Sequence, residues 1–164
     1  MQATRIELMQ GMPIFGAVRD DVLQFLLEQA QVVAVPTGGY FFREGEEAQG
    51  MFVLEAGSVA VLKNWEGCKY KLREFGRGDC FGEMALMDMM PRSASVKALQ
   101  DCSAIELRPD HLMRVFEFDV EQFALIQMNM GREVCRRLRS TDERLFAARM
   151  TAEPPTLIMP RPKL

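Results

Sequence analysis

The sequence predicts a mainly β protein with flanking helices, built around an antiparallel sandwich or barrel. Between residues 31 and 107, short apolar runs recur with turn signals between them, which is typical of many short strands. Before and after this region the apolar residues follow a helical period instead. About eight strands at this spacing indicate an antiparallel sandwich or barrel rather than a parallel sheet.

The first 30 residues are predicted to be helical, with one break. The break falls at residues 12–15, Met-Pro-Ile-Phe. From Asp20 onward the apolar residues leave polar ones between them at helical spacing, and Asp20 or Asp21 near the start suits the helix dipole. We expect this helix to pack against the barrel.

The strands of the central region are bounded by glycine, proline or acidic residues. Ala56-Gly57 is predicted to form a tight hairpin between two of them, and the turn at 76–79 leads into the segment 81–96. The strands are expected at 32–35, 40–42, 51–55, 58–63, 68–75, 92–99 and 102–107, and the hairpin joins 51–55 to 58–63.

Beyond residue 108 the pattern becomes helical. Pro109 suits a first helical turn, and Asp119 is a plausible N-cap for a long helix that ends near Met150. This helix could pack on its own barrel or pair with its twin in a homodimer. We favour the homodimer because a stripe at alternating spacings of four and three continues past the length that one barrel could cover. The stripe consists of Val120, Ala124, Gln127, Gly131, Val134, Leu138, Thr141, Leu145 and Ala148.

These patterns divide the chain into four segments. They are an N-terminal helical segment (1–30), the β-barrel (31–108), the C-terminal helices (109–150) and a Pro-rich tail (151–164), which we expect to be extended and poorly ordered. The 164 residues leave room for one domain with a sizeable core.

Composition argues against several classes of protein. The net charge of −3 and the pI of about 5.3 are unlike those of a general nucleic-acid binder. There is no apolar run long enough for a transmembrane helix and no signal-peptide pattern, so a cytoplasmic location is expected. The arginines of the long helix are interspersed with acidic residues, and we interpret them as a solvated face: Arg132, Arg136, Arg137, Arg139 and Arg144. Scattered cysteines without a C-x-x-C pair indicate reduced thiols: Cys68, Cys80, Cys102 and Cys135.

The segment 81–96 carries the strongest functional signal. If Arg92 opens a strand, its side chain shares a face with Ala94 and Val96 and points inward. A buried guanidinium is costly unless an anion meets it. The anion could be Glu83 of the same chain or a phosphate of a ligand, which the planar fork of arginine binds bidentately.

The residues before Arg92 also suit a phosphorylated sugar. Gly82 allows a ligand to approach the backbone closely, and an ionised Glu83 can accept hydrogen bonds from sugar hydroxyls. A helix that starts within Met84–Met87 would direct free N–H groups toward an anion.

This segment resembles the phosphate-binding cassette of the cyclic nucleotide-binding domain family. The family includes the bacterial catabolite activator and the regulatory subunits of cyclic-AMP-dependent kinase. Gly45, Gly57 and the acidic pair Glu46–Glu47 match further family signatures, so the resemblance covers roughly residues 13–150. It implies an eight-stranded antiparallel jelly-roll (double-stranded β-helix) barrel with a short cassette helix and a long C-terminal helix.

The resemblance also implies roles for single residues. Glu83 would take the ribose 2′-hydroxyl with Gly82 against the ribose, and Arg92 would take the exocyclic phosphate oxygens. Backbone N–H groups at Ala85 and Ser93 would complete the phosphate cradle. The predicted ligand-binding set is therefore Gly82, Glu83, Met84, Ala85, Arg92 and Ser93, with Gln127 and Met128 as possible purine contacts on the long helix.

The predicted function is a cyclic nucleotide sensor, with cyclic AMP favoured over cyclic GMP by analogy with the bacterial branch. Its output would pass through helix 119–150 to a second copy or an unknown partner, without direct DNA binding, because too few residues follow that helix for a helix-turn-helix. We expect no enzyme activity, cofactor or metal, since His111 is the single histidine and cannot supply the ligand set of a cupin or a catalytic triad. Two alternatives are a transcription-regulator subunit that acts via a partner, and a ligand-free dimerisation or scaffold module in which Glu83 pairs with Arg92.

Overall fold

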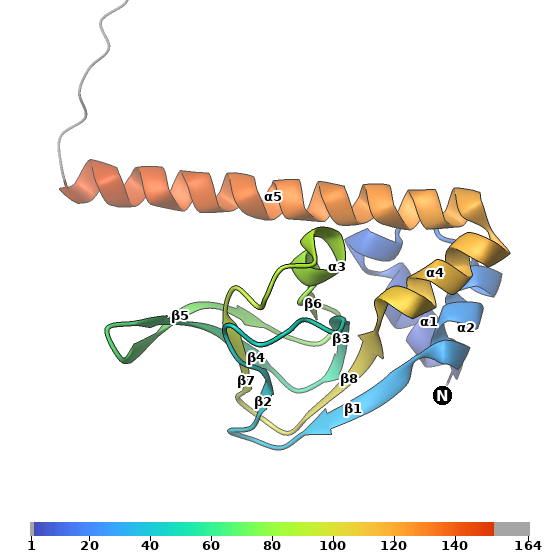
Figure 1. Cartoon of the computed structure of the whole chain (residues 1–164), viewed down its shortest axis with the longest axis horizontal. Helices are drawn as coiled ribbons and strands as arrows, with labels where there is room; N and C mark the ends of the chain where they lie inside the picture. Colours follow the sequence, from blue (N-terminus) through green and yellow to red (C-terminus); the bar gives the residue numbers. More distant parts are fainter. Residues whose placement is uncertain (1, 153–164) are drawn as a thin grey trace, which may run out of the picture. The chain divides into compact units, whose positions relative to one another are not determined.

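The computed structural model describes residues 2–152, and its centre consists of two antiparallel sheets (Figure 1). One four-stranded sheet has the order β1-β8-β3-β6, and the other has the order β2-β7-β4-β5. This confirms the mainly β jelly-roll prediction, although strand pairing in the described residues leaves two separate sheets. The strands are β1 (Gln31–Val35), β2 (Tyr40–Phe42), β3 (Met51–Ala56), β4 (Val59–Trp65), β5 (Cys68–Phe75), β6 (Cys80–Phe81), β7 (Ser95–Ala98) and β8 (Cys102–Leu107).

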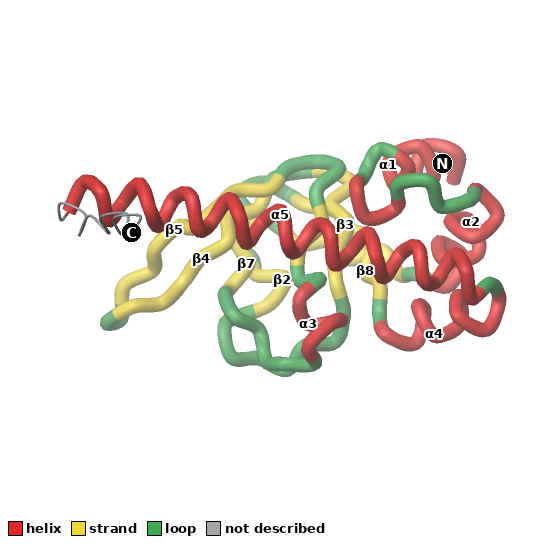
Figure 2. The backbone as a smooth tube through the Cα atoms, turned by 90° about the horizontal axis from the view of Figure 1, so that it is seen from above, coloured by secondary structure: helices red, strands yellow, loops and turns green. Residues whose placement is uncertain are grey.

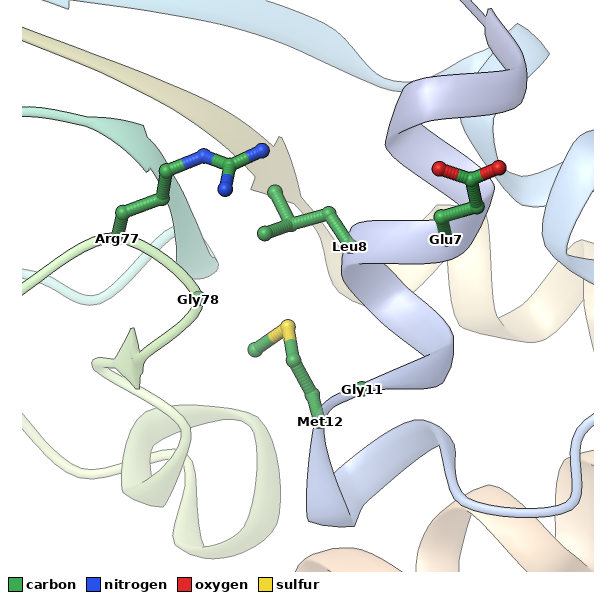
Figure 3. A pocket seen from close by; sticks show the side chains of 6 residues that line it. All are labelled: Glu7, Leu8, Gly11, Met12, Arg77 and Gly78. Atoms are coloured by element: carbon green, nitrogen blue, oxygen red, sulfur yellow. The ribbon is translucent and has the colours of Figure 1, made fainter.

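Helices precede, interrupt and follow the sheets. In Figure 2, α1, α2 and α4 lie together at one end of the strands, whereas the β4–β5 hairpin extends at the other end. No helix in the described part of the chain is long and apolar enough to cross a membrane. The helices are α1 (Gln2–Gln10), η1 (Pro13–Phe15), α2 (Asp20–Gln29), α3 (Met84–Asp88), α4 (Pro109–Phe118) and α5 (Val120–Ala152).

The chain forms two compact units, and the boundary lies within α5. The first unit ends at Met130 and the second begins at Gly131. In the second unit α5 carries ion pairs along its own surface, where Glu133 accepts from Arg136 and, at 2.9 Å, from Nε of Arg137. The Arg136 side chain is 59% exposed, but those of Arg137 and Glu133 are only 20% and 13% exposed, so the solvated helix face stays a prediction.

Strands β3 and β8 separate two hydrophobic clusters, because alternate side chains of a strand point to opposite faces. Val53 and Ile105 contribute to a cluster shared with the helices, which we call the helical core. Phe52 and Ala104 contribute to a cluster between the two sheets, which we call the barrel interior. Most other members of the helical core are aliphatic side chains or methionines of the helices, including Met9, Ile14, Val22, Leu23, Leu26, Leu112, Val115, Ile126 and Met130.

The junction between the sheets and the C-terminal helices follows the predicted capping pattern. Pro109 occupies the first turn of α4, and Oδ1 of Asp119 accepts a hydrogen bond from the N–H of Gln122 at 3.0 Å. His111 is buried, and its Nδ1 accepts from the backbone N–H of Arg108 at 3.2 Å. The single histidine is therefore engaged in capping and packing of α4.

One predicted strand is shorter than expected. The sequence predicts a strand from Arg92 to Leu99, but β7 begins at Ser95. The residues before it follow Pro91 and pair with a turn instead, because Arg92 exchanges two backbone hydrogen bonds with Gly45 and Glu46. The prediction for 92–94 is therefore wrong.

Candidate functional site

The backbone of Arg92 is fixed by the turn that follows β2. Its N–H donates to the carbonyl oxygen of Glu46 at 2.9 Å, and its own carbonyl accepts from the N–H of Gly45 at 2.8 Å. The side chain is only 6% exposed, and its guanidinium carbon lies 3.9 Å from the centroid of the Phe42 ring. Arg92 is therefore held inward by backbone pairing and by a cation–π contact.

Two backbone carbonyls receive the guanidinium. Nη2 of Arg92 donates to the oxygen of Gly50 at 2.7 Å, and Nη1 donates to the oxygen of Gly82 at 3.2 Å. Nε is buried and has no hydrogen-bond partner. Because a buried donor without a partner is costly, the site has unused capacity for an acceptor such as an anionic oxygen.

Gly82 is the residue on which this arrangement depends sterically. Its φ of +80° lies in the left-handed region that favours glycine. A Cβ atom at this position would lie 2.7 Å from Nη1 of Arg92 and 3.3 Å from the oxygen of Gly50. A side chain here would therefore displace the guanidinium as well as strain the backbone.

Glu83 follows at once and places a carboxylate in the same buried region. It is 3% exposed, and its backbone carbonyl accepts from the N–H of Leu86 at 3.0 Å in the first turn of α3. Burial lowers the pKa of the Arg92 guanidinium from its ordinary value, while the charges of Glu106, Glu46 and Glu83 oppose that change. The region is thus a buried group of charges of both signs.

Aromatic rings form the apolar surroundings of these charges. The rings of Phe52 and Phe81 stack with centroids 5.4 Å apart, and Phe41 meets Phe81 edge-on at 5.1 Å. Phe42, which lies under Arg92, is 6.0 Å from Phe52. This aromatic floor lowers the local dielectric constant and strengthens electrostatic contacts made above it.

Four other predicted residues, Met84, Ser93, Gln127 and Met128, are less enclosed than Glu83 and Arg92. Met84 and Ser93 are exposed, and the carbonyl of Ser93 accepts from Nζ of Lys63 at 2.7 Å. Ala85 contributes its backbone to the first turn of α3. On α5, Gln127 is half-buried and Met128 is exposed.

The structure therefore brings Gly82, Glu83 and Arg92 together, whereas a purine contact at Gln127 or Met128 stays a prediction. Phe42 and Glu106 belong to the same buried region but were missed. The sequence does carry a signal for Glu106, because it is a charged residue at an inward position of a predicted strand.

Comparisons with known proteins agree with this geometry. A family model described as cyclic nucleotide-binding domain matches residues 32–119. The chain is 30% identical over 136 residues to the cyclic AMP receptor protein of Thermus thermophilus, covering 82% of this chain and 61% of that protein. It is 38% identical over 91 residues to a cGMP-dependent protein kinase of Toxoplasma gondii, covering 56% of this chain and 9% of the kinase.

Solved structures give the same result for the fold. The crystal structure of the Thermus thermophilus catabolite activator protein matches with a TM-score of 0.73 and 26% identity, over 83% of this chain and 62% of that one. A cyclic nucleotide-binding domain from Methylobacillus flagellatus matches with a TM-score of 0.80 and 22% identity, over 90% and 83% of the two chains. The chain spans less than two thirds of the length of the receptor protein and of the kinase.

Proposed function

Because the chain belongs to the cyclic nucleotide-binding domain family, we propose that it binds a cyclic nucleotide between its sheets and acts as a non-catalytic regulatory module. The observation that carries the proposal is the buried guanidinium of Arg92, which has an unpartnered Nε and lies over Phe42 beside Gly82. A ligand phosphate supplies the anionic acceptor that this group lacks.

Each cassette residue has a chemical task in this proposal. Arg92 exchanges neutral carbonyl acceptors for two phosphate oxygens, which form shorter and stronger charge-assisted bonds. Glu83 accepts a hydrogen bond from the ribose 2′-hydroxyl, and Gly82 leaves room for the ribose. The backbone N–H groups at Met84, Ala85 and Ser93 add donors around the phosphate.

We propose cyclic AMP as the preferred ligand. The support is the relative named as a cyclic AMP receptor protein, which matches over 82% of this chain, whereas the relative named as a cGMP-dependent kinase matches over 56%. Ser93 is the residue that could reverse this preference, because its exposed hydroxyl could accept from the 2-amino group of a guanine in the syn conformation.

Paired calorimetric titrations with cyclic AMP and cyclic GMP test the binding proposal. We expect one site per chain and tighter binding of cyclic AMP. Tighter binding of cyclic GMP that is lost in Ser93→Ala would reverse the choice of base while keeping the site. The absence of heat and of a thermal shift with both nucleotides would overturn the proposal in favour of a ligand-free dimerisation or scaffold module.

We further propose that the signal leaves through α5 to a second copy of the chain. Two large apolar residues seven positions apart on α5, Leu138 and Leu145, are 59% and 51% exposed. Residues at this spacing share one face of a helix and suit pairing with an identical helix. Mass measurement in solution should give a dimer for the wild-type chain and a monomer for the double variant Leu138→Lys, Leu145→Lys. A monomeric wild-type chain would point to a different partner.

A further inference from the structure

Glu106 is a buried carboxylate at an inward position of β8. Along this strand, Ile105 and Leu107 belong to the helical core, whereas Ala104 belongs to the barrel interior. Glu106 has the parity of Ala104, is opposite Phe52 of β3, and is 8% exposed. Its side chain therefore faces the barrel interior, which also contains the aromatic floor under Arg92.

The guanidinium of Arg92 reaches the same end of β8. Its Nη2 donates to the oxygen of Gly50, the residue that precedes β3. Gly50 lies tight against the end of β8, since a Cβ atom there would be 2.5 Å from the oxygen of Leu107 and 3.4 Å from Cα of Arg108. Among the three carboxylates that favour the charged form of Arg92 and so raise its pKa, Glu106 has the largest effect.

A second cation shares this carboxylate. Nη2 of Arg108 donates to Oε2 of Glu106 at 3.2 Å, and the Arg108 side chain is 42% exposed. Nε of Arg108 is buried without a hydrogen-bond partner, as is Nε of Arg92. One buried carboxylate thus pairs with a guanidinium at the solvent boundary and acts electrostatically on a second one inside the barrel.

We propose that Glu106 is a positioning residue that holds Arg92 on the carbonyls of Gly50 and Gly82 and competes with the phosphate of the ligand. Arg108 weakens this competition by drawing the carboxylate toward itself. The inference rests on the proposed function, because it assumes that Arg92 receives a phosphate. In this proposal Glu106 of β8 sets the affinity for the ligand although it does not contact the ligand.

The competition predicts opposite effects of two neighbouring substitutions. Glu106→Gln keeps the shape and removes the charge, so the affinity for cyclic AMP should rise by about two- to 150-fold, the range of coupling between residues in one charged network. Arg108→Gln leaves Glu106 to act on Arg92 alone, so the affinity should fall by several-fold. The double variant should bind as tightly as Glu106→Gln, because Arg108 acts only through Glu106.

Calorimetric titration of the full chain with cyclic AMP and with cyclic GMP, for the wild type and these three variants, tests the inference. Glu55→Gln is the matched control, since Glu55 is also a partly buried strand carboxylate paired with an arginine, Arg5, and its loss should leave affinity unchanged. If Glu106→Gln does not fold, the fall in affinity of Arg108→Gln still tests the proposal.

The outcomes distinguish a failure of the role of Glu106 from a failure of the proposed function. The competition is supported if the two single variants shift the affinity for cyclic AMP in opposite directions and the double variant binds as tightly as Glu106→Gln. A wild type that binds, together with equal or uniformly weaker binding by both single variants, overturns the role of Glu106 and leaves the proposed function intact. A wild type that binds neither nucleotide overturns both.

Discussion

The two faces of β3 and β8 differ in what they bury. Toward the helical core the strands present Val53, Ile105 and Leu107, which are at most 1% exposed and meet apolar side chains of the helices. Toward the barrel interior the same strands present Phe52 of β3 and, opposite it near the end of β8, Glu106. One pair of strands therefore carries an apolar face on one side and a face that ends in buried charge on the other.

This difference indicates a division of labour. Burial of apolar area is the main favourable term in folding, so the helical core should supply much of the stability. Buried charges such as Glu83, Arg92 and Glu106 are costly to desolvate and add little net stability. Their presence in the interior is understandable if that face binds an anion, and the predictions below test whether stability and binding separate in this way.

The largest expected effect is on binding. Arg92→Ala should weaken the binding of cyclic AMP by about 30-fold or more, because loss of one partner of a buried charge pair costs about 2–5 kcal/mol. Its melting temperature should also fall, because Glu83 and Glu106 lose a compensating charge in the buried region, so the affinity is measured at a temperature at which the variant is folded. Calorimetry and thermal melting measure the two quantities. Arg43→Ala, at an exposed arginine of the neighbouring turn, is the control and should bind as the parent does.

A change in free energy of similar size, but in stability alone, is expected from a truncation in the helical core. Leu23 of α2 is fully buried, so Leu23→Ala should lower the free energy of unfolding by about 2–5 kcal/mol through lost contacts and a cavity. Urea denaturation measures it. The folded variant should keep the parental affinity for cyclic AMP, and a large loss of affinity would show that the two faces are not separable. Leu99→Ala, at an exposed site, should change stability by less than about 0.5 kcal/mol.

Two glycines allow the effect of backbone strain on stability to be separated from the effect of a side chain on ligand binding. Gly82 and Gly67 share a φ of +80°, but a Cβ atom at Gly67 meets nothing within 4 Å. Alanine at either position should cost about 1–2 kcal/mol of stability from the left-handed backbone. Only Gly82→Ala should also weaken cyclic AMP binding, by about tenfold, because its Cβ displaces the Arg92 guanidinium. Equal affinities for the two variants would contradict the placement of Gly82 at the site.

The smallest expected effect lies at the opposite end of β8. Asp101 accepts from the N–H and the hydroxyl of Thr37, both at 2.8 Å, and these bonds lower the pKa of its carboxyl group. A carboxyl group whose pKa is depressed by folding stabilises the folded state at pH values above its unfolded pKa of about 3.9. This stabilisation is lost as the pH falls through the lower pKa of the folded state. Asp101→Asn should therefore reduce the acid sensitivity of the melting temperature below about pH 4 and leave ligand affinity unchanged. Thermal melts from pH 7 to pH 3 would show this, and an unaltered pH profile would contradict it.

The inward position of Arg92 shows how a correct prediction can rest on incomplete reasoning. The alternation of Arg92, Ala94 and Val96 predicts an inward guanidinium, and the guanidinium is buried. The strand that this alternation assumes begins only at Ser95, and the turn at Gly45–Glu46 holds Arg92 instead. The contact between these distant segments cannot be predicted from local periodicity.

Local signals predict what depends on neighbours in the sequence. The break before Asp119 and its capping of α5 follow from residue types within one turn, as does the first turn of α4 at Pro109. The electrostatic effect of Glu106 on Arg92 depends on strand pairing and on the tight approach of Gly50 to β8. Such contacts between residues distant in the sequence can be identified only in the folded structure.

In this protein the barrel interior should bind the ligand and the helical core should stabilise the fold. The most direct test is one calorimetric comparison of cyclic AMP affinity among the wild type, Arg92→Ala and Leu23→Ala, at a temperature at which all three are folded. We expect equal affinities for the wild type and Leu23→Ala, and binding about 30-fold or more weaker for Arg92→Ala. Binding by Arg92→Ala as tight as that of the wild type would contradict it.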